Sequence, residues 1–163
     1  MAKKRCIILV LCILISVSIS SPLLAQNRPI QLALVTPIQI FPEDIPIAGV
    51  RFSLLYGRSV SVTGLDLGLV NHTTTGSFQG LQYGLVGIVD SDFIGWQDCG
   101  VNVTQGRCEG FQSGIVNYAK VMSGVQLGLV NYARNMKGLQ VGLVNIIRQG
   151  GAFPVFPIVN WSF

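Results

Sequence analysis

One eight-residue phrase, repeated along the chain, limits what this sequence can fold into more than any other feature. The phrase reads GFQSGIVN, GVQLGLVN and GLQVGLVN in its three clearest copies, which follow one another. Weaker copies precede these three, and they include GLDLGLVN, GLQYGLVG and the degraded GWQDCGVN. The copies start at residues 49, 64, 80, 95, 110, 124 and 138. A period of 14 to 16 residues predicts one repeat array over residues 49–147.

Within each copy the side chains alternate with a period of two. Leucine, valine and tyrosine take one face of an extended chain, and glycine and glutamine take the other. Two glycines four residues apart disfavour a helix, because each costs roughly 1 kcal/mol relative to alanine. Each copy is therefore predicted to form a strand of about ten residues. The residues assigned to the repeat framework are Gly64, Gly68, Asn71, Gly80, Gly84, Gly110, Gly114, Asn117, Gly124, Gly128, Asn131, Gly138, Gly142 and Asn145.

Two all-β architectures fit these strands. The first prediction is an antiparallel barrel of about eight strands, with leucine facing lipid and with glycine and glutamine inside. The alternative is a parallel β-solenoid, in which stacking places like residues on one another. In that fold we expect Leu67, Leu127 and Val141 to stack inside the coil. We also expect a ladder of side-chain amides from Asn71, Asn117, Asn131 and Asn145.

The segments around the array indicate export. A basic start at residues 3–5, an apolar run and a small-residue segment ending at Ala25 predict a signal peptide over residues 1–25. An N-terminal segment follows over residues 26–48, and a C-terminal segment covers residues 148–163. Three of the eleven basic residues lie in the signal segment, which leaves eight against seven acidic residues. This balance gives no reason to expect a nucleic-acid partner.

Few residues suggest chemistry. Cys99 and Cys108 are nine residues apart, and a close pair in an exported chain predicts a disulfide. His72, the one histidine, lies in a different repeat, so we expect no metal site and no cofactor. We interpret His72 as an exposed loop histidine, because no third catalytic partner accompanies it. The sequence therefore predicts a protein that is not an enzyme.

Two stretches resemble known protein families. The array from Gly64 to Asn145 resembles the tandem unit G-L-Q-L-G-L-V-N-x-A of exported bacterial surface-repeat proteins. Trp161 and Phe163 resemble the C-terminal signal of bacterial outer-membrane β-barrels, although Pro154 and Pro157 depart from a fully paired strand. These resemblances imply an exported protein of the outer membrane or cell surface, with outer-membrane lipid as a partner. They imply no particular activity.

The function expected from the sequence is therefore structural. We expect a non-enzymatic protein of the outer membrane or cell surface. The alternative is a secreted binding module that recognises a partner through its inter-repeat loops, because loops on a rigid scaffold carry much of protein recognition. The irregular stretch Val89–Glu109 belongs to that candidate surface.

Overall fold

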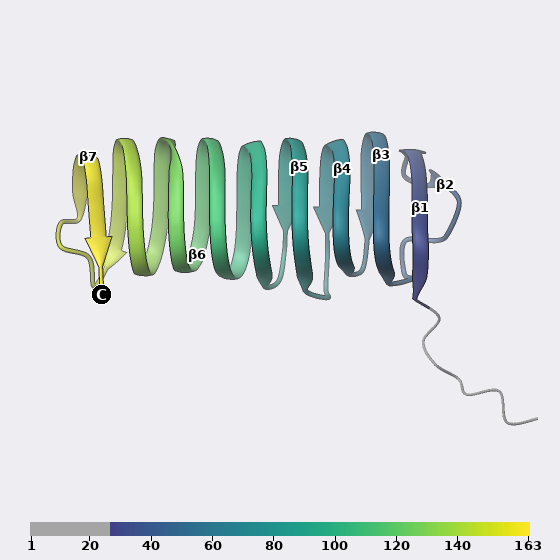
Figure 1. The fold of residues 1–163 in the computed structure, drawn as a ribbon, viewed down its shortest axis with the longest axis horizontal. Coiled ribbons are helices and arrows are strands. Elements are labelled where there is room, and N and C mark those ends of the chain that lie inside the picture. The colour runs from purple at the N-terminus through teal and green to yellow at the C-terminus, as the bar shows by residue number, and fades with distance from the viewer. Residues whose placement is uncertain (1–26) are drawn as a thin grey trace, which may run out of the picture.

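The computed structural model describes residues 27–163, so the predicted signal peptide lies outside the described residues. The strands are β1 (Arg28–Val35), β2 (Ile38–Gln39), β3 (Ile47–Ser59), β4 (Val62–Thr73), β5 (Phe78–Val89), β6 (Phe93–Gln149) and β7 (Val155–Ser162). The long β6 winds through successive coils that stack along one axis with β3, β4 and β5 (Figure 1). Within residues 27–163, no helix is long and apolar enough to span a membrane.

The strands pair in parallel, and equal positions of successive repeats lie side by side. Gly64 pairs with Gly49 of the preceding coil and with Gly80 of the following one. Barrel strands instead alternate in direction, so the predicted antiparallel barrel is wrong and the alternative, a parallel β-solenoid, is confirmed. Parallel neighbours need a crossover between them, and the return half of each coil supplies it.

Different strands cover the two ends of the stack. At the N-terminal end, β1 pairs in parallel with β3 and carries β2 on its other side. At the C-terminal end, β7 pairs antiparallel with the last coil of β6, where Trp161 lies opposite Leu139. The predicted C-terminal signal thus lies in and just after this end strand, and Phe163 is 93% exposed. Covered ends protect a solenoid from adding further chains.

The apolar core is a narrow column inside the coils. Phe78 and Phe93 from adjacent coils stack with ring centroids 4.9 Å apart. Each coil contributes the residue two positions before the first glycine of the phrase: Ile47, Val62, Phe78, Phe93, Cys108, Met122 and Met136. Four of the coils add the residue nine positions after that glycine: Val89, Ala119, Ala133 and Ile147. Most leucines lie outside instead, and Leu127 is 46% exposed. The expectation that Leu67, Leu127 and Val141 stack inside is therefore wrong, because glutamine and asparagine fill that space.

Candidate functional site

A ladder of buried glutamines runs through the coils. Each side-chain Nε2 donates to the Oε1 of the glutamine one coil earlier, at 2.7 or 2.8 Å. In the later coils, Nε2 also donates to the backbone carbonyl six residues ahead. The ladder consists of Gln82, Gln97, Gln112, Gln126 and Gln140, all fully buried. These bonds allow a polar interior, because a buried amide without partners costs free energy.

The glutamine ladder ends on a buried ion pair. Arg51 donates from Nε and Nη2 to the two carboxylate oxygens of Asp66 at 2.7 and 2.6 Å. Both side chains are 0% exposed. Gln82 Nε2 donates to Asp66 Oδ2 at 2.9 Å. Because a carboxylate can only accept, Asp66 sets the direction in which every later amide donates.

A second ladder, of asparagines, runs in the opposite direction. Asn117 Nδ2 donates to Asn131 Oδ1, and Asn131 Nδ2 donates to Asn145 Oδ1, each at 2.8 Å. The predicted asparagine ladder is confirmed over these residues, and Asn102 extends it by one coil. Asn71 stands apart, since the next coil has Gly87 at this position. The donors of this ladder point toward the C-terminus, so its dipoles oppose those of the glutamine ladder.

The two glycines of the phrase are required by close approach between coils. The first has a positive φ, +139° at Gly138, and a Cβ there would lie 1.9 Å from the carbonyl oxygen of Gly124. A Cβ on the second, Gly142, would lie 2.6 Å from Nδ2 of Asn131 in the preceding coil. The second glycine therefore leaves the space that the asparagine occupies, and the phrase G-x-Q-x-G-x-x-N records how one coil packs on another.

The predicted disulfide between Cys99 and Cys108 is wrong. Both cysteines are free, and both are buried. Cys99 replaces the second glycine of its coil, and it pairs in register with Gly84. A Cβ on Gly87 would lie 2.9 Å from Cys99 Sγ, so the sulfur fills space left by the missing asparagine. Cys108 lies in the apolar column instead. Burial raises the pKa of both thiols to about 12, which keeps them protonated.

His72 lies on β4, so its interpretation as an exposed loop histidine is wrong. Its Nδ1 is 2.9 Å from the hydroxyl of Tyr56, and its Nε2 is 2.8 Å from Oδ2 of Asp90. The three side chains come from successive coils and join them on the outer surface. A tyrosine phenol takes the place that serine has in a hydrolytic triad, so the arrangement differs from that triad at the nucleophile.

Exposed apolar side chains gather along one edge of the solenoid. They stand at the fifth position after the first glycine, and they are 43–66% exposed. Contiguous apolar surface of this kind marks a site of contact with another molecule or with a membrane. We call this edge the apolar rim, and it consists of Leu69, Leu85, Ile115, Leu129 and Leu143, together with the valine that follows each.

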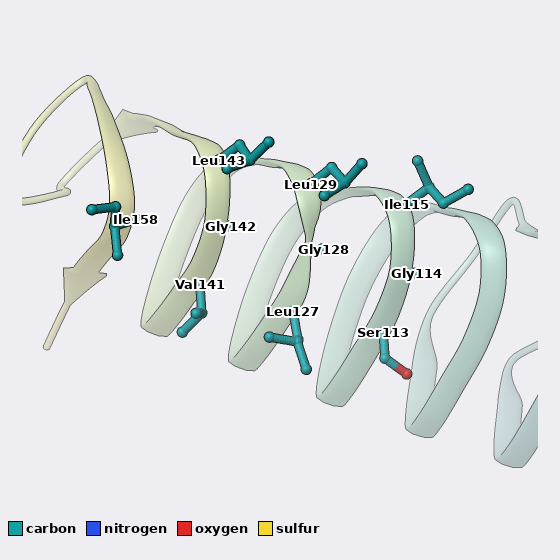
Figure 2. Close-up of a pocket in the computed structure, with 10 residues that line it drawn as sticks. All are labelled: Ser113, Gly114, Ile115, Leu127, Gly128, Leu129, Val141, Gly142, Leu143 and Ile158. Carbon is teal, nitrogen blue, oxygen red and sulfur yellow. The ribbon is translucent and has the colours of Figure 1, made fainter.

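A shallow apolar groove runs beside the rim at the C-terminal end. Ile115, Leu129 and Leu143 form one wall, and Ser113, Leu127 and Val141 form the other. The backbone of the second glycines lies between the two rows, as Figure 2 shows. A second groove repeats this arrangement near the N-terminal end, with Leu54, Leu69 and Leu85 on one wall. The surface is therefore ribbed along the solenoid axis, with apolar rows that follow the stacking.

Charged side chains occupy the opposite part of each coil. The connections between β3, β4 and β5 lie along one edge, away from the rounded edge where each coil turns back (Figure 1). We call this part of the coils the charged edge, and its exposed charges from the end of the third coil onward are Asp90, Asp92, Arg107, Glu109, Lys120, Arg134, Lys137 and Arg148. The coil that starts at Gly95 breaks the segregation, with Asp98 and Gly100 on the apolar side.

Three cations of the charged edge stack in one column. Lys120, Arg134 and Arg148 each follow the first glycine of their coil by ten residues, and all three are exposed. Within the described part of the chain, none of them forms an ion pair. We call them the basic ladder. The sequence reasoning missed it, although the 14-residue spacing of the three cations was visible once a stacked fold was considered.

Comparison with protein-family models, with curated proteins and with solved structures finds no match to this chain.

Proposed function

We propose that this chain is an exported, non-enzymatic structural protein that lies on outer-membrane or cell-surface lipid. The apolar rim enters the hydrocarbon boundary, and the charged edge stays outside the hydrocarbon. The observation that supports this proposal is the segregation of exposed leucines and exposed charges to different edges of the same coils. An interfacial element with one apolar and one charged side lies in the membrane plane and does not cross it.

The size of the rim sets the strength of such binding. Its five large side chains are each close to half exposed. Burying the exposed half of a leucine side chain contributes about 1 kcal/mol, so the five contribute about 5 kcal/mol. A single acyl chain gives membrane binding of about this strength, which is reversible. The rim alone therefore supports contact with lipid but not permanent anchoring.

Other observations favour lipid over a protein held by the inter-repeat loops. The connection between β3 and β4 consists of Val60 and Ser61 alone, which offers little surface for a partner. The rim, by contrast, presents exposed apolar side chains from five coils along one edge of the stack, with a gap at Gly100. Export is supported by the signal pattern of residues 1–25 and by the resemblance of the repeat to exported surface-repeat proteins.

Flotation with neutral phosphatidylcholine vesicles tests the proposal. We expect the protein to float with the vesicles in high salt, because burial of apolar surface does not depend on ionic attraction. Replacing Leu85, Leu129 and Leu143 together by serine should abolish flotation. The matched control replaces Gln105, Asn135 and Gln149 on the charged edge by serine, and it should float as wild type does.

Two results would overturn the proposal. One is a wild-type protein that stays at the bottom of the gradient. The other is flotation that persists in the triple leucine variant. Sedimentation without vesicles completes the test, because self-association through the rim would appear as a dimer that the same leucine variant dissociates.

A further inference from the structure

We infer that the basic ladder, Lys120, Arg134 and Arg148, binds the phosphate headgroups of anionic lipids. This inference rests on the proposed function and assigns a lipid class to the same surface. It draws on three properties of the C-terminal coils. They are the stacking of unpaired cations, the order of side chains along each strand, and the contrast with the N-terminal coils.

Stacking holds the three cations close together. The 14-residue register is set by the hydrogen bonds that Asn117 donates to Asn131 and that Gln140 donates to Gln126. Neighbouring strands lie about 4.8 Å apart, so the three side chains leave the surface at that spacing. Like charges opposite one another destabilise a sheet, and no carboxylate pairs with these three. A bound row of anions would remove this repulsion.

The side chains along each strand follow the order of a membrane interface. From the rim outward, one coil presents Val130, Tyr132 and Arg134, each two residues after the last. Two residues of strand span about 6.6 Å, so the cation stands about 13 Å from the rim valine. Aromatic residues prefer the level of the headgroups, and cations prefer the phosphate beyond it. Tyr118 and Tyr132 stack in adjacent coils with ring centroids 5.2 Å apart.

The surface around these cations is hollowed and polar. A groove of about 740 Å³ is lined by Lys120, Arg134 and Arg148, by the stacked Tyr118 and Tyr132, and by Asp90, Gln105 and Gln149. The three cations lie at the C-terminal end of this groove, and Asp90, the one carboxylate that lines it, lies at the other end. Asp90 is in addition held by His72 Nε2 at 2.8 Å. Negative groups are therefore expected to bind over the last three coils.

The N-terminal coils lack this feature at the same position. Thr74, Asp90 and Gln105 follow the first glycine of their coils by ten residues, where the later coils carry cations. Outside the ladder, Arg58 pairs with Glu43 and Arg107 pairs with Glu109, each at 3.5 Å, whereas the exposed Lys137 forms no ion pair among the described residues. The rim continues over both halves, so lipid contact is general while headgroup contact is confined to the C-terminal half. A weak apolar anchor that is joined by a basic patch gives stable attachment.

Vesicle binding separates this inference from the proposed function. The two probes are vesicles of phosphatidylcholine alone and vesicles of equal parts phosphatidylcholine and phosphatidylglycerol. Each cation near an anionic surface strengthens binding roughly fivefold, so wild type should bind the mixed vesicles roughly 100-fold more tightly than the neutral ones. Replacing all three cations, as K120Q/R134Q/R148Q, should remove this preference and leave binding to neutral vesicles unchanged.

Matched variants and a soluble competitor complete the design. Arg107→Gln removes the same charge from the same edge outside the ladder, so it should weaken binding to the mixed vesicles less than Arg134→Gln does. Glycerol phosphate supplies the anion without the lipid, and it should compete weakly, because it leaves the rim exposed. The inference is overturned if the triple variant keeps the preference, if Arg107→Gln matches Arg134→Gln, or if glycerol phosphate displaces the protein fully. Failure of the wild-type protein to bind neutral vesicles would instead refute the proposed function.

Discussion

Replacing the buried ion pair by two glutamines should leave the solenoid nearly as stable as wild type, although either single replacement destabilises it strongly. Arg51 donates to both oxygens of Asp66 and to the carbonyl of His72, and both charged side chains are fully buried. Arg51→Gln leaves a buried carboxylate without its cation, and Asp66→Gln leaves a buried guanidinium without its anion. Each single variant is expected to lose about 3–5 kcal/mol of unfolding free energy.

The double variant rebuilds the arrangement of the later coils. There, Gln126 Nε2 donates to Gln112 Oε1 one coil earlier and to the Tyr132 carbonyl six residues ahead. A glutamine at position 66 stands in the same relation to position 51 and to the carbonyl of His72. The double variant should therefore lie within about 1 kcal/mol of wild type, which makes the coupling energy about 5 kcal/mol or more.

Urea unfolding measures this cycle. Far-UV circular dichroism follows the strands, and the fluorescence of Trp96 and Trp161 follows two separate places in the stack. Comparing both probes matters, because solenoids can unfold in parts. The reasoning fails if the double variant is as unstable as the sum of the two single variants. A single variant that does not fold would still leave the double variant decisive.

Three further predictions concern the interior. Asn131→Ala removes the donor to Asn145 Oδ1 and should lower the unfolding free energy in urea by about 2–4 kcal/mol. The control Asn135→Ala, on the exposed edge, should lower it by less than about 0.5 kcal/mol. Equal losses would contradict a buried ladder. Gly142→Ala places a Cβ 1.9 Å from the carbonyl oxygen of Gly128, so a loss of about 3 kcal/mol is expected in the same assay, and a neutral result would show that the coils can move apart. The buried thiols, whose pKa is raised from 9.0 to about 12, should react with iodoacetamide at pH 8 roughly 1,000-fold more slowly in the folded protein than in urea, as mass spectrometry can follow. Because the folded state keeps these thiols protonated, unfolding free energy should also fall as pH rises above 9.

The period-two pattern separated two faces of each strand, but it did not identify which face is buried in the solenoid. Glutamine and glycine point into the coil and most leucines point out. The barrel prediction placed the leucines outside and the solenoid prediction placed Leu67, Leu127 and Val141 inside, so the alternation alone did not say which face is buried. The choice between the two folds depends on which strand donates hydrogen bonds to which, and that pairing is absent from a local pattern. The barrel prediction assumed that the exposed leucines must face lipid around a closed sheet, whereas in the solenoid they lie along one side of the stacked coils.

Compensations between coils were likewise hidden in the sequence. Cys99 in GWQDCGVN looks like a degraded copy that invites a disulfide with Cys108. In the stack, Cys99 fills the space left by Gly87 of the preceding coil. Cys108 packs in the apolar column at the position that Phe93 and Met122 occupy in the neighbouring coils. Both substitutions make sense only against the neighbouring coil. The His72 contacts with Tyr56 and Asp90 also join residues 16 and 18 positions away along the chain.

The sequence by itself determined the repeat length, the extended backbone of each copy and the asparagine ladder, because these follow from local periodicity and from the like-on-like stacking of near-identical units. Only the tertiary structure decided that the strands run parallel, that both thiols stay free, and that three cations spaced 14 residues apart stand in one column. The physical reason is that each of these depends on contacts between coils. The stacking distance between strands turns a separation of 14 residues into one of about 4.8 Å.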